Sequence, residues 1–188
     1  MEPALVVGFL IAVFAICVPA AMYNGLVRMR NHCRESWSDV DTELKRRHDL
    51  IPNLVETVKG YARHESSLLE RVTLARTRAM SAGDSREALS ERERELAGAL
   101  AGVLAVVENY PDLKADGHFK QLMAELVLTE DRIQASRRFF NANVRDYNSR
   151  CQTFPSMILA RAFGFEEEEF FELSDVRERQ TPSVHLET

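Results

Sequence analysis

The chain has 188 residues, which is about right for one domain together with a membrane anchor. Hydrophobic residues make up 45% and charged residues 28%, so neither a disordered chain nor a protein with many membrane spans is expected. The net charge of -5 gives no general attraction to nucleic acid or to anionic lipid. Three cysteines without a CxxC motif suggest no disulfide framework and favour a reducing compartment.

The first element is an uncharged apolar run from Pro3 to Met22. As a helix it would span roughly 30 Å, the thickness of the hydrocarbon core of a bilayer. We therefore predict a transmembrane anchor over residues 1–24. The residues that mark it are Pro3, Ala4, Leu10, Phe14, Cys17 and Met22.

A cleaved signal peptide is the alternative interpretation of this run. Residues 18–21 could serve as a weak cleavage site, but only Met1 and Glu2 precede the run, where a signal peptide has a basic segment. Arg28, Arg30 and Arg34 follow the run, and no Lys or Arg precedes it. The positive-inside rule then places Met1 outside and the C-terminal part in the cytoplasm.

The next element is a stripe of residues whose spacings alternate between four and three. Such a stripe predicts a long helix with coiled-coil-like packing, and Pro52 lies inside it. Proline removes the hydrogen bond to the carbonyl of His48, but the stripe keeps its phase, so we expect a kinked, continuous helix. The members are Cys33, Trp37, Val40, Leu44, Arg47, Ile51, Leu54, Val58 and Tyr61.

Further helical patterns follow along the chain. One over residues 68–79 could continue the first helix, because only Gly60 interrupts it. Residues 81–85 predict a turn with Ser85 as the cap of a third helix over residues 89–107. Residues 110–118 are expected to form a loop. A fourth helix over residues 119–149 and a short apolar helix over residues 156–163 complete the pattern.

The predicted fold class is therefore all-α. The N-terminal transmembrane helix continues directly into an antiparallel bundle of long helices. We place the bundle domain at residues 25–173 and a disordered, acidic tail at residues 174–188.

Several strings in the chain together resemble the bacterial LemA family. They cover roughly residues 20–171, occur in the family's order and depart from its pattern at Phe140, where tyrosine is usual. The strings are Tyr23-Asn24-x-Leu26-Val27, Trp37-x-Asp39-x-Asp41, residues 44–55, residues 108–115, Glu130-x-x-Ile133, Phe140-Asn141-x-x-Val144-x-x-Tyr147-Asn148 and Phe154-Pro155.

The resemblance implies a single-pass protein of the bacterial inner membrane with a helical, cytoplasmic domain. It implies no established activity. It suggests links to membrane stress and to membrane zinc peptidases of the HtpX type, and some magnetosome proteins are relatives. A membrane zinc peptidase is therefore a possible partner, on family association alone, beside the lipid bilayer and further copies of the chain.

Charged residues on two helices predict a buried ion network. Arg47 lies on the apolar stripe, so it requires a carboxylate partner, either Glu130 or another. The simple interpretation is a polar pair that sets the register of the bundle, and the functional one is a cleft for an anion or a partner. The other residues of this predicted polar network are Arg46, Asp49, Pro52, Asn53 and Arg137.

Asn141, Tyr147 and Asn148 lie on one predicted helix, and such side chains require hydrogen bonds when buried. We expect them to cap the loop at Tyr110 or the kink at Pro52, with a ligand pocket as the alternative.

No catalytic motif is evident. The five histidines form no HExxH and no ligand-like pair, and no phosphate-binding or nucleophile motif occurs. We therefore expect no enzyme, no metal site and no cofactor.

The late apolar segment is the best candidate for an interaction. It packs back on the bundle or, alternatively, contacts a partner subunit or the membrane surface. Four glutamates at 166–169 would oppose contact with anionic lipid. Its residues are Met157, Ile158, Leu159, Phe163, Phe165, Phe170 and Phe171.

Three functions remain open from the sequence. The first is a membrane-anchored scaffold or adaptor that acts through homo-oligomerisation or partner binding. The second is a membrane-shaping or envelope-stress protein that forms large lateral assemblies. The third, and least favoured, is an enzyme with an unfamiliar site around Arg47, Glu130 and Arg137.

Overall fold

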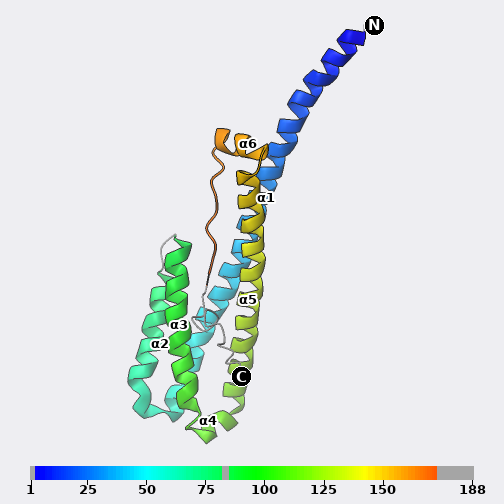
Figure 1. Cartoon of the computed structure of the whole chain (residues 1–188). Helices are drawn as coiled ribbons and strands as arrows, with labels where there is room; N and C mark the ends of the chain where they lie inside the picture. The colour runs from blue at the N-terminus through cyan, green and yellow to red at the C-terminus, as the bar shows by residue number, and fades with distance from the viewer. Residues whose placement is uncertain (1–2, 82–84, 173–188) are drawn as a thin grey trace, which may run out of the picture. The chain divides into compact units, whose positions relative to one another are not determined.

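The computed structural model describes residues 3–81 and 85–172, and every regular element in these ranges is a helix (Figure 1). The all-α fold class is thus confirmed. The predicted disordered tail at 174–188 lies outside the described residues, as does the centre of the predicted turn at 81–85. The elements are α1 (Pro3–Tyr61), the 3-10 turn η1 (Arg63–Glu65), α2 (Ser66–Met80), α3 (Arg86–Val107), α4 (Pro111–Ala115), α5 (Gly117–Gln152) and α6 (Ser156–Ala162).

Helix α1 is one uninterrupted α-helix of 59 residues that includes Pro19 and Pro52. The expected continuity across Pro52 is confirmed. The helix ends at Tyr61, however, and the expectation that it could continue through residues 68–79 is wrong. Ala62 is buried and leaves the helical conformation, and the chain then turns through η1. This turn lets the apolar face of α2 pack into the core, whereas a straight continuation of α1 would leave that face in water.

Contacts between Cα atoms divide the chain into two units. Unit 1 contains residues 3–44 and 131–170 of the described chain, and unit 2 contains residues 45–81, 85–130 and 171–172. Helices α1 and α5 each contribute one part to each unit.

Unit 2 is built from the C-terminal part of α1, from α2, α3 and α4, and from the N-terminal part of α5. Its core continues the predicted stripe with Ile51, Leu54 and Val58 of α1. A Cβ atom added to Gly102 of α3 would lie 3.2 Å from Leu68 of α2, so the missing side chain allows these two helices to approach closely. As predicted, Ser85 caps α3, its hydroxyl accepting from the amide of Ala88.

The segment expected to be a loop at 110–118 contains a helix. Pro111 occupies the first turn of α4, where its missing N–H costs nothing, and Asp112 stabilises the positive end of that turn. Helix α5 then begins at Gly117, and the Asp116 carboxylate accepts a 2.9 Å hydrogen bond from the amide of Phe119. Both helix starts thus have local stabilisation that the sequence analysis overlooked.

Unit 1 pairs the N-terminal part of α1 with the C-terminal part of α5. The rings of Trp37 and Phe140 lie 5.2 Å apart, and Leu26, Val40 and Tyr147 are further buried residues of the same unit. Helix α6 follows where a short helix was predicted. It ends at Ala162, and two residues later Gly164, with a φ of +67°, allows the Phe165 amide to donate back to the carbonyl of Ala160.

Candidate functional site

The most unusual feature of unit 2 is a group of ionisable side chains, three of them buried, which we call the ionic cluster: Arg47, His48, Glu93 and Glu130. The Arg47 guanidinium donates from Nη1 to Glu130 Oε2 at 2.9 Å and from Nη2 to Glu93 Oε2. His48 Nε2 donates to Glu93 Oε1 at 2.7 Å. The Glu93 side chain has no solvent exposure, whereas that of Glu130 is 43% exposed.

Helix periodicity explains why Glu93 reaches Arg47. Arg47 occupies a position of the α1 stripe. On α3 the spacing from Leu89 to Glu93 is four and from Glu93 to Leu96 is three, so Glu93 points to the same face as the core. The gap of seven residues between Leu89 and Leu96 was the signal that could have identified this residue, which the sequence analysis missed.

The ionic cluster holds Glu93 in its charged form. Burial by itself would raise the pKa of this carboxyl group. The hydrogen bond from His48 and the positive charge of Arg47 outweigh burial, so the pKa of Glu93 lies below its ordinary value of 4.5. The cluster is therefore a compensated set of charges, which suits a role in setting helix register better than proton transfer.

A second polar contact links α2 to the same turn of α1. Pro52 has no N–H, so the carbonyl of His48 loses its helical donor. Arg76 of α2 replaces this donor, with its Nε 2.6 Å from the carbonyl oxygen. The sequence analysis predicted the free carbonyl but not Arg76. With Glu93 and Glu130, the residues around Arg47 and His48 connect α1 to α2, α3 and α5.

The other predicted members of the polar network do not join the ionic cluster. Arg46, Asp49, Pro52 and Asn53 are exposed on α1. The remaining ones belong to residues 131–170 and hence to unit 1: Arg137, Asn141, Tyr147 and Asn148.

Asn148 has a different role from the expected one. Its side-chain amide donates to the Glu168 carbonyl, and its side-chain oxygen accepts from the Glu168 amide, both at 2.9 Å. It thus holds the segment after α6 and does not cap Tyr110 or Pro52. Burial, together with a hydrogen bond to Cys151, raises the pKa of Tyr147 well above its ordinary value. Tyr147 therefore stays neutral and belongs to the core.

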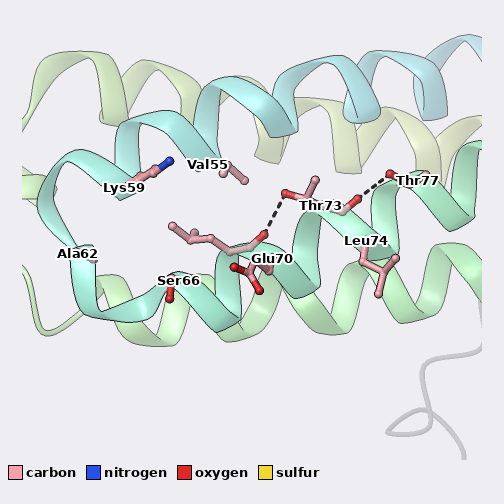
Figure 2. Close-up of a pocket in the computed structure, with 9 residues that line it drawn as sticks. Val55, Lys59, Ala62, Ser66, Glu70, Thr73, Leu74 and Thr77 are labelled. Atoms are coloured by element: carbon pink, nitrogen blue, oxygen red, sulfur yellow. Dashed lines mark hydrogen bonds between the residues drawn. The ribbon is translucent and has the colours of Figure 1, made fainter.

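Unit 2 also has an open groove of about 500 Å³ between α1 and α2 (Figure 2). Val55 and Lys59 line it from α1, and Glu70 and Leu74 line it from α2. The threonines of α2 use their hydroxyls within the helix: Thr73 donates to the Leu69 carbonyl at 3.0 Å, and Thr77 to the Thr73 carbonyl at 2.9 Å. The groove is thus mostly apolar and contains no catalytic arrangement.

In unit 1 an aromatic cluster joins α6 to α1. The ring centroid of Tyr23 lies 5.0 Å from that of Phe163 and 5.6 Å from that of Phe165. The guanidinium of Arg30 lies over the Phe165 ring at 4.8 Å. Tyr23 and Arg30 belong to α1, and Phe163 and Phe165 follow directly after α6.

The predicted interaction residues fall into two groups. Phe165 and Phe171 are buried, and Met157 and Leu159 are half-buried, so part of the segment packs back on the protein. Ile158, Phe163 and Phe170 are exposed. Packing against the protein is thus confirmed for part of the segment, and contact of the exposed part with a partner subunit or the membrane surface stays a prediction.

Of the described residues, α1 is the one helix long and apolar enough to cross a membrane by length and composition. Its most apolar window has a mean hydropathy of 2.4, and none of it is buried in the protein. Leu10, Phe14 and Cys17 are all exposed. A helix in the core of a soluble protein would be mostly buried, so this exposure favours contact with lipid.

The model of the LemA family matches residues 36–186 of the chain. This protein belongs to the LemA family. Magnetosome protein MamQ 2 of Paramagnetospirillum magneticum is 27% identical over 193 residues, which cover 89% of this chain and 71% of that protein. Magnetosome protein MamQ of Magnetospirillum gryphiswaldense is 27% identical, covering 79% of this chain and 64% of that protein. Protein LemA of Metamycoplasma hominis is 24% identical, covering 81% and 70%.

The LemA match contains the complete ionic cluster, the groove and α6, but begins after the apolar segment of α1. Among the described residues, no three His, Cys, Asp or Glu side chains are grouped so that they could hold a metal ion. What this member of the family offers chemically is thus a set of compensated buried charges, an apolar groove and an exposed apolar face on α6.

Proposed function

We propose that this protein is a membrane-anchored scaffold or adaptor that acts through homo-oligomerisation or partner binding at the cytoplasmic face of the inner membrane. The observation that carries the proposal is the continuity of α1. One helix holds both the exposed apolar segment and Arg47 of the ionic cluster, with no linker between them. A partner bound to the bundle would therefore be tethered to the bilayer through one continuous helix.

Charge and cysteine state support the proposed orientation. Arg28, Arg30 and Arg34 lie on the C-terminal flank of the apolar segment, as the positive-inside rule requires for a cytoplasmic bundle. Cys151 is buried and is not part of a disulfide, which suits a reducing compartment. Fusions of green fluorescent protein and of alkaline phosphatase to the C-terminus test this: we expect fluorescence and no phosphatase activity. The opposite pattern would contradict the orientation.

A scaffold needs stiffness more than reactive groups, and the ionic cluster suits this role. Paired buried charges disfavour alternative helix registers, because a shift would leave a charge buried without its partner. The bundle would then present its surface in one arrangement. The relatives that are named magnetosome proteins are compatible with a LemA-family protein that works as part of an assembly.

The decisive experiment is in vivo crosslinking of the full chain, extraction in a mild detergent and identification of everything in its peak. A stoichiometric foreign protein, a membrane zinc peptidase being one example, would support the adaptor. A peak of several copies of the chain alone would support the scaffold. A monomer without any partner, or a chain found in the soluble fraction, would overturn the proposal.

A variant with a charge inside the apolar segment is the matched control. Phe14→Arg places a cation in the middle of the segment, where charges cost the most in a bilayer. It should lose membrane association while unit 2, which contains none of these residues, stays folded. A partner that is isolated with the natural chain but not with Phe14→Arg depends on the anchor for its binding.

The second candidate function is membrane shaping. The specific observation in its favour is the exposed apolar face of α6 beside the first residue after the apolar segment. Purified full chain added to vesicles should then form ordered lateral assemblies visible by electron microscopy. Vesicles that stay spherical and carry only isolated copies would leave the scaffold as the better proposal.

A further inference from the structure

Unit 1 has an exposed apolar face at α6, to which neither the ionic cluster nor the groove of unit 2 gives a role. We define this α6 face as Phe154 just before α6, Ile158 within it and Phe163 just after it, which are 72%, 57% and 60% exposed. The helix buries the small residues Ser156 and Ala160 against the protein. Large apolar side chains within and next to α6 are thus left exposed while small ones are buried, a packing that contact with water alone would not favour.

The place of the α6 face along α1 suggests what covers it. Tyr23 is the first residue after the apolar run that ends at Met22. Its ring contacts both Phe163 and Phe165, so the end of α6 lies beside the end of the apolar segment (Figure 1). If that segment crosses the bilayer, α6 lies at the depth of the lipid headgroups.

The orientation of the α6 face is fixed by the surrounding contacts. Ser156 donates to the carbonyls of Arg150 and Thr153, at 2.6 and 2.9 Å, and so ties the start of α6 to the end of α5. Beyond α6, the two hydrogen bonds between Asn148 and Glu168 hold the following segment. The exposed side chains therefore cannot turn inward without breaking these bonds.

We propose that the α6 face inserts into the interfacial region of the bilayer and forms a second membrane contact beside the anchor. This inference rests on the proposed function, since it requires that residues 3–22 span the membrane. Aromatic and apolar side chains are favoured at this depth, where part of the ring meets the acyl chains. A helix of seven residues also offers less surface than a stable protein interface requires, which favours lipid over a protein partner.

Charge specifies which lipid surface suits the α6 face. Arg161 is exposed on α6, but residues 166–169 are four consecutive glutamates just after it. The glutamates oppose attraction to anionic lipid, so insertion depends on the apolar side chains and proceeds in zwitterionic phosphatidylcholine. The contact would fix the tilt of the N-terminal part of α1 in the membrane.

Tryptophan fluorescence of the full chain in phosphatidylcholine vesicles tests the inference. In a Trp37→Phe background, the reporter Ile158→Trp should show blue-shifted emission and roughly twofold quenching by lipids brominated near the headgroup. Phe139→Trp is the matched control, since Phe139 is 60% exposed in the same unit but lies on α5, thirteen residues before α5 ends at Gln152. This control should be neither shifted nor quenched.

A third reporter separates failure of this inference from failure of the anchor. Phe14→Trp, inside the apolar segment, should be quenched by lipids brominated deep in the acyl chain. One outcome would overturn the α6 contact and leave the anchor intact: Phe14→Trp is quenched, but the Ile158→Trp reporter behaves like the Phe139→Trp control. No quenching at Phe14→Trp would overturn the anchor itself. Quenching of Ile158→Trp only in anionic vesicles would overturn the contact proposed here.

Discussion

Units 1 and 2 use the same two long helices but stabilise them differently. In the part of the chain that the structure describes, the buried charges Arg47 and Glu93 belong to unit 2. The buried polar residues of unit 1 are neutral, namely Ser36, Asn148 and Ser156. Ion pairs depend strongly on register, whereas apolar packing tolerates some change. The comparison indicates that unit 2 sets the helix register and unit 1 adapts to its surroundings.

Removal of Glu93 should have the largest effect on this difference. The Glu93→Leu variant leaves the Arg47 guanidinium buried with a single, partly exposed carboxylate, and removes the partner of His48. We expect a loss of about 3–5 kcal/mol in the free energy of unfolding. Urea denaturation of the full chain in detergent, followed by circular dichroism, measures it.

Two controls make this result specific to charge. Glu130→Gln changes the exposed partner and should cost at most about 1 kcal/mol. The double variant Arg47→Met with Glu93→Leu removes both buried charges and should recover most of the stability lost in the single variant. Equal losses in Glu93→Leu and Glu130→Gln would show that the buried pair does not set the stability of unit 2.

Acid should weaken unit 2 through the same carboxyl group. Because the pKa of Glu93 is lower in the folded chain than its ordinary value of 4.5, its contribution is complete above that pH. It is lost as the pH falls through the lowered value. The natural chain should therefore lose more stability below pH 4.5 than Glu93→Gln does, when both are measured by denaturation across this range. Parallel pH profiles for the two proteins would contradict this assignment.

Substitution of Arg76 should have a smaller effect. Arg76→Met leaves the carbonyl of His48 without a donor, since Pro52 has none to offer, and should cost about 1–3 kcal/mol. In a Pro52→Ala background the helix supplies its own N–H to that carbonyl. The cost of Arg76→Met should then fall, and a double-mutant cycle on unfolding free energies measures the coupling. A coupling near zero would mean that Arg76 acts elsewhere.

The smallest effect is expected in the core of unit 1. Phe140 is buried and packs against the ring of Trp37, and a substitution that keeps most of the apolar volume is tolerated well, so Phe140→Leu should cost roughly 1 kcal/mol. Thermal unfolding of the same full-length protein provides the measurement. A loss of unfolding free energy as large as that of Glu93→Leu would show that the core of unit 1 tolerates substitution no better than the ionic cluster of unit 2.

Local patterns in the sequence were sufficient for most helices. The four-three stripe predicted α1 across Pro52, Ser85 predicted the start of α3, and the apolar pattern over residues 156–163 predicted α6. These features depend on residues a few positions apart, so the chain encodes them without reference to its fold. The reversal after Tyr61 was missed, because burial of the apolar face of α2 outweighed the helical pattern that continues past Gly60. The helix α4 was missed, because Pro111 stabilises a first helical turn in a segment that Pro and Gly residues marked as a loop.

The sequence by itself determined that Arg47 requires a carboxylate and that the His48 carbonyl requires a donor. Only the tertiary structure decided that Glu93 and Arg76 supply them, alongside the predicted candidate Glu130. Glu93 lies 46 residues from Arg47 and Arg76 lies 28 residues from His48. Periodicity shows which face of a helix a residue lies on, but helix packing alone determines which faces meet and at what height along the helices.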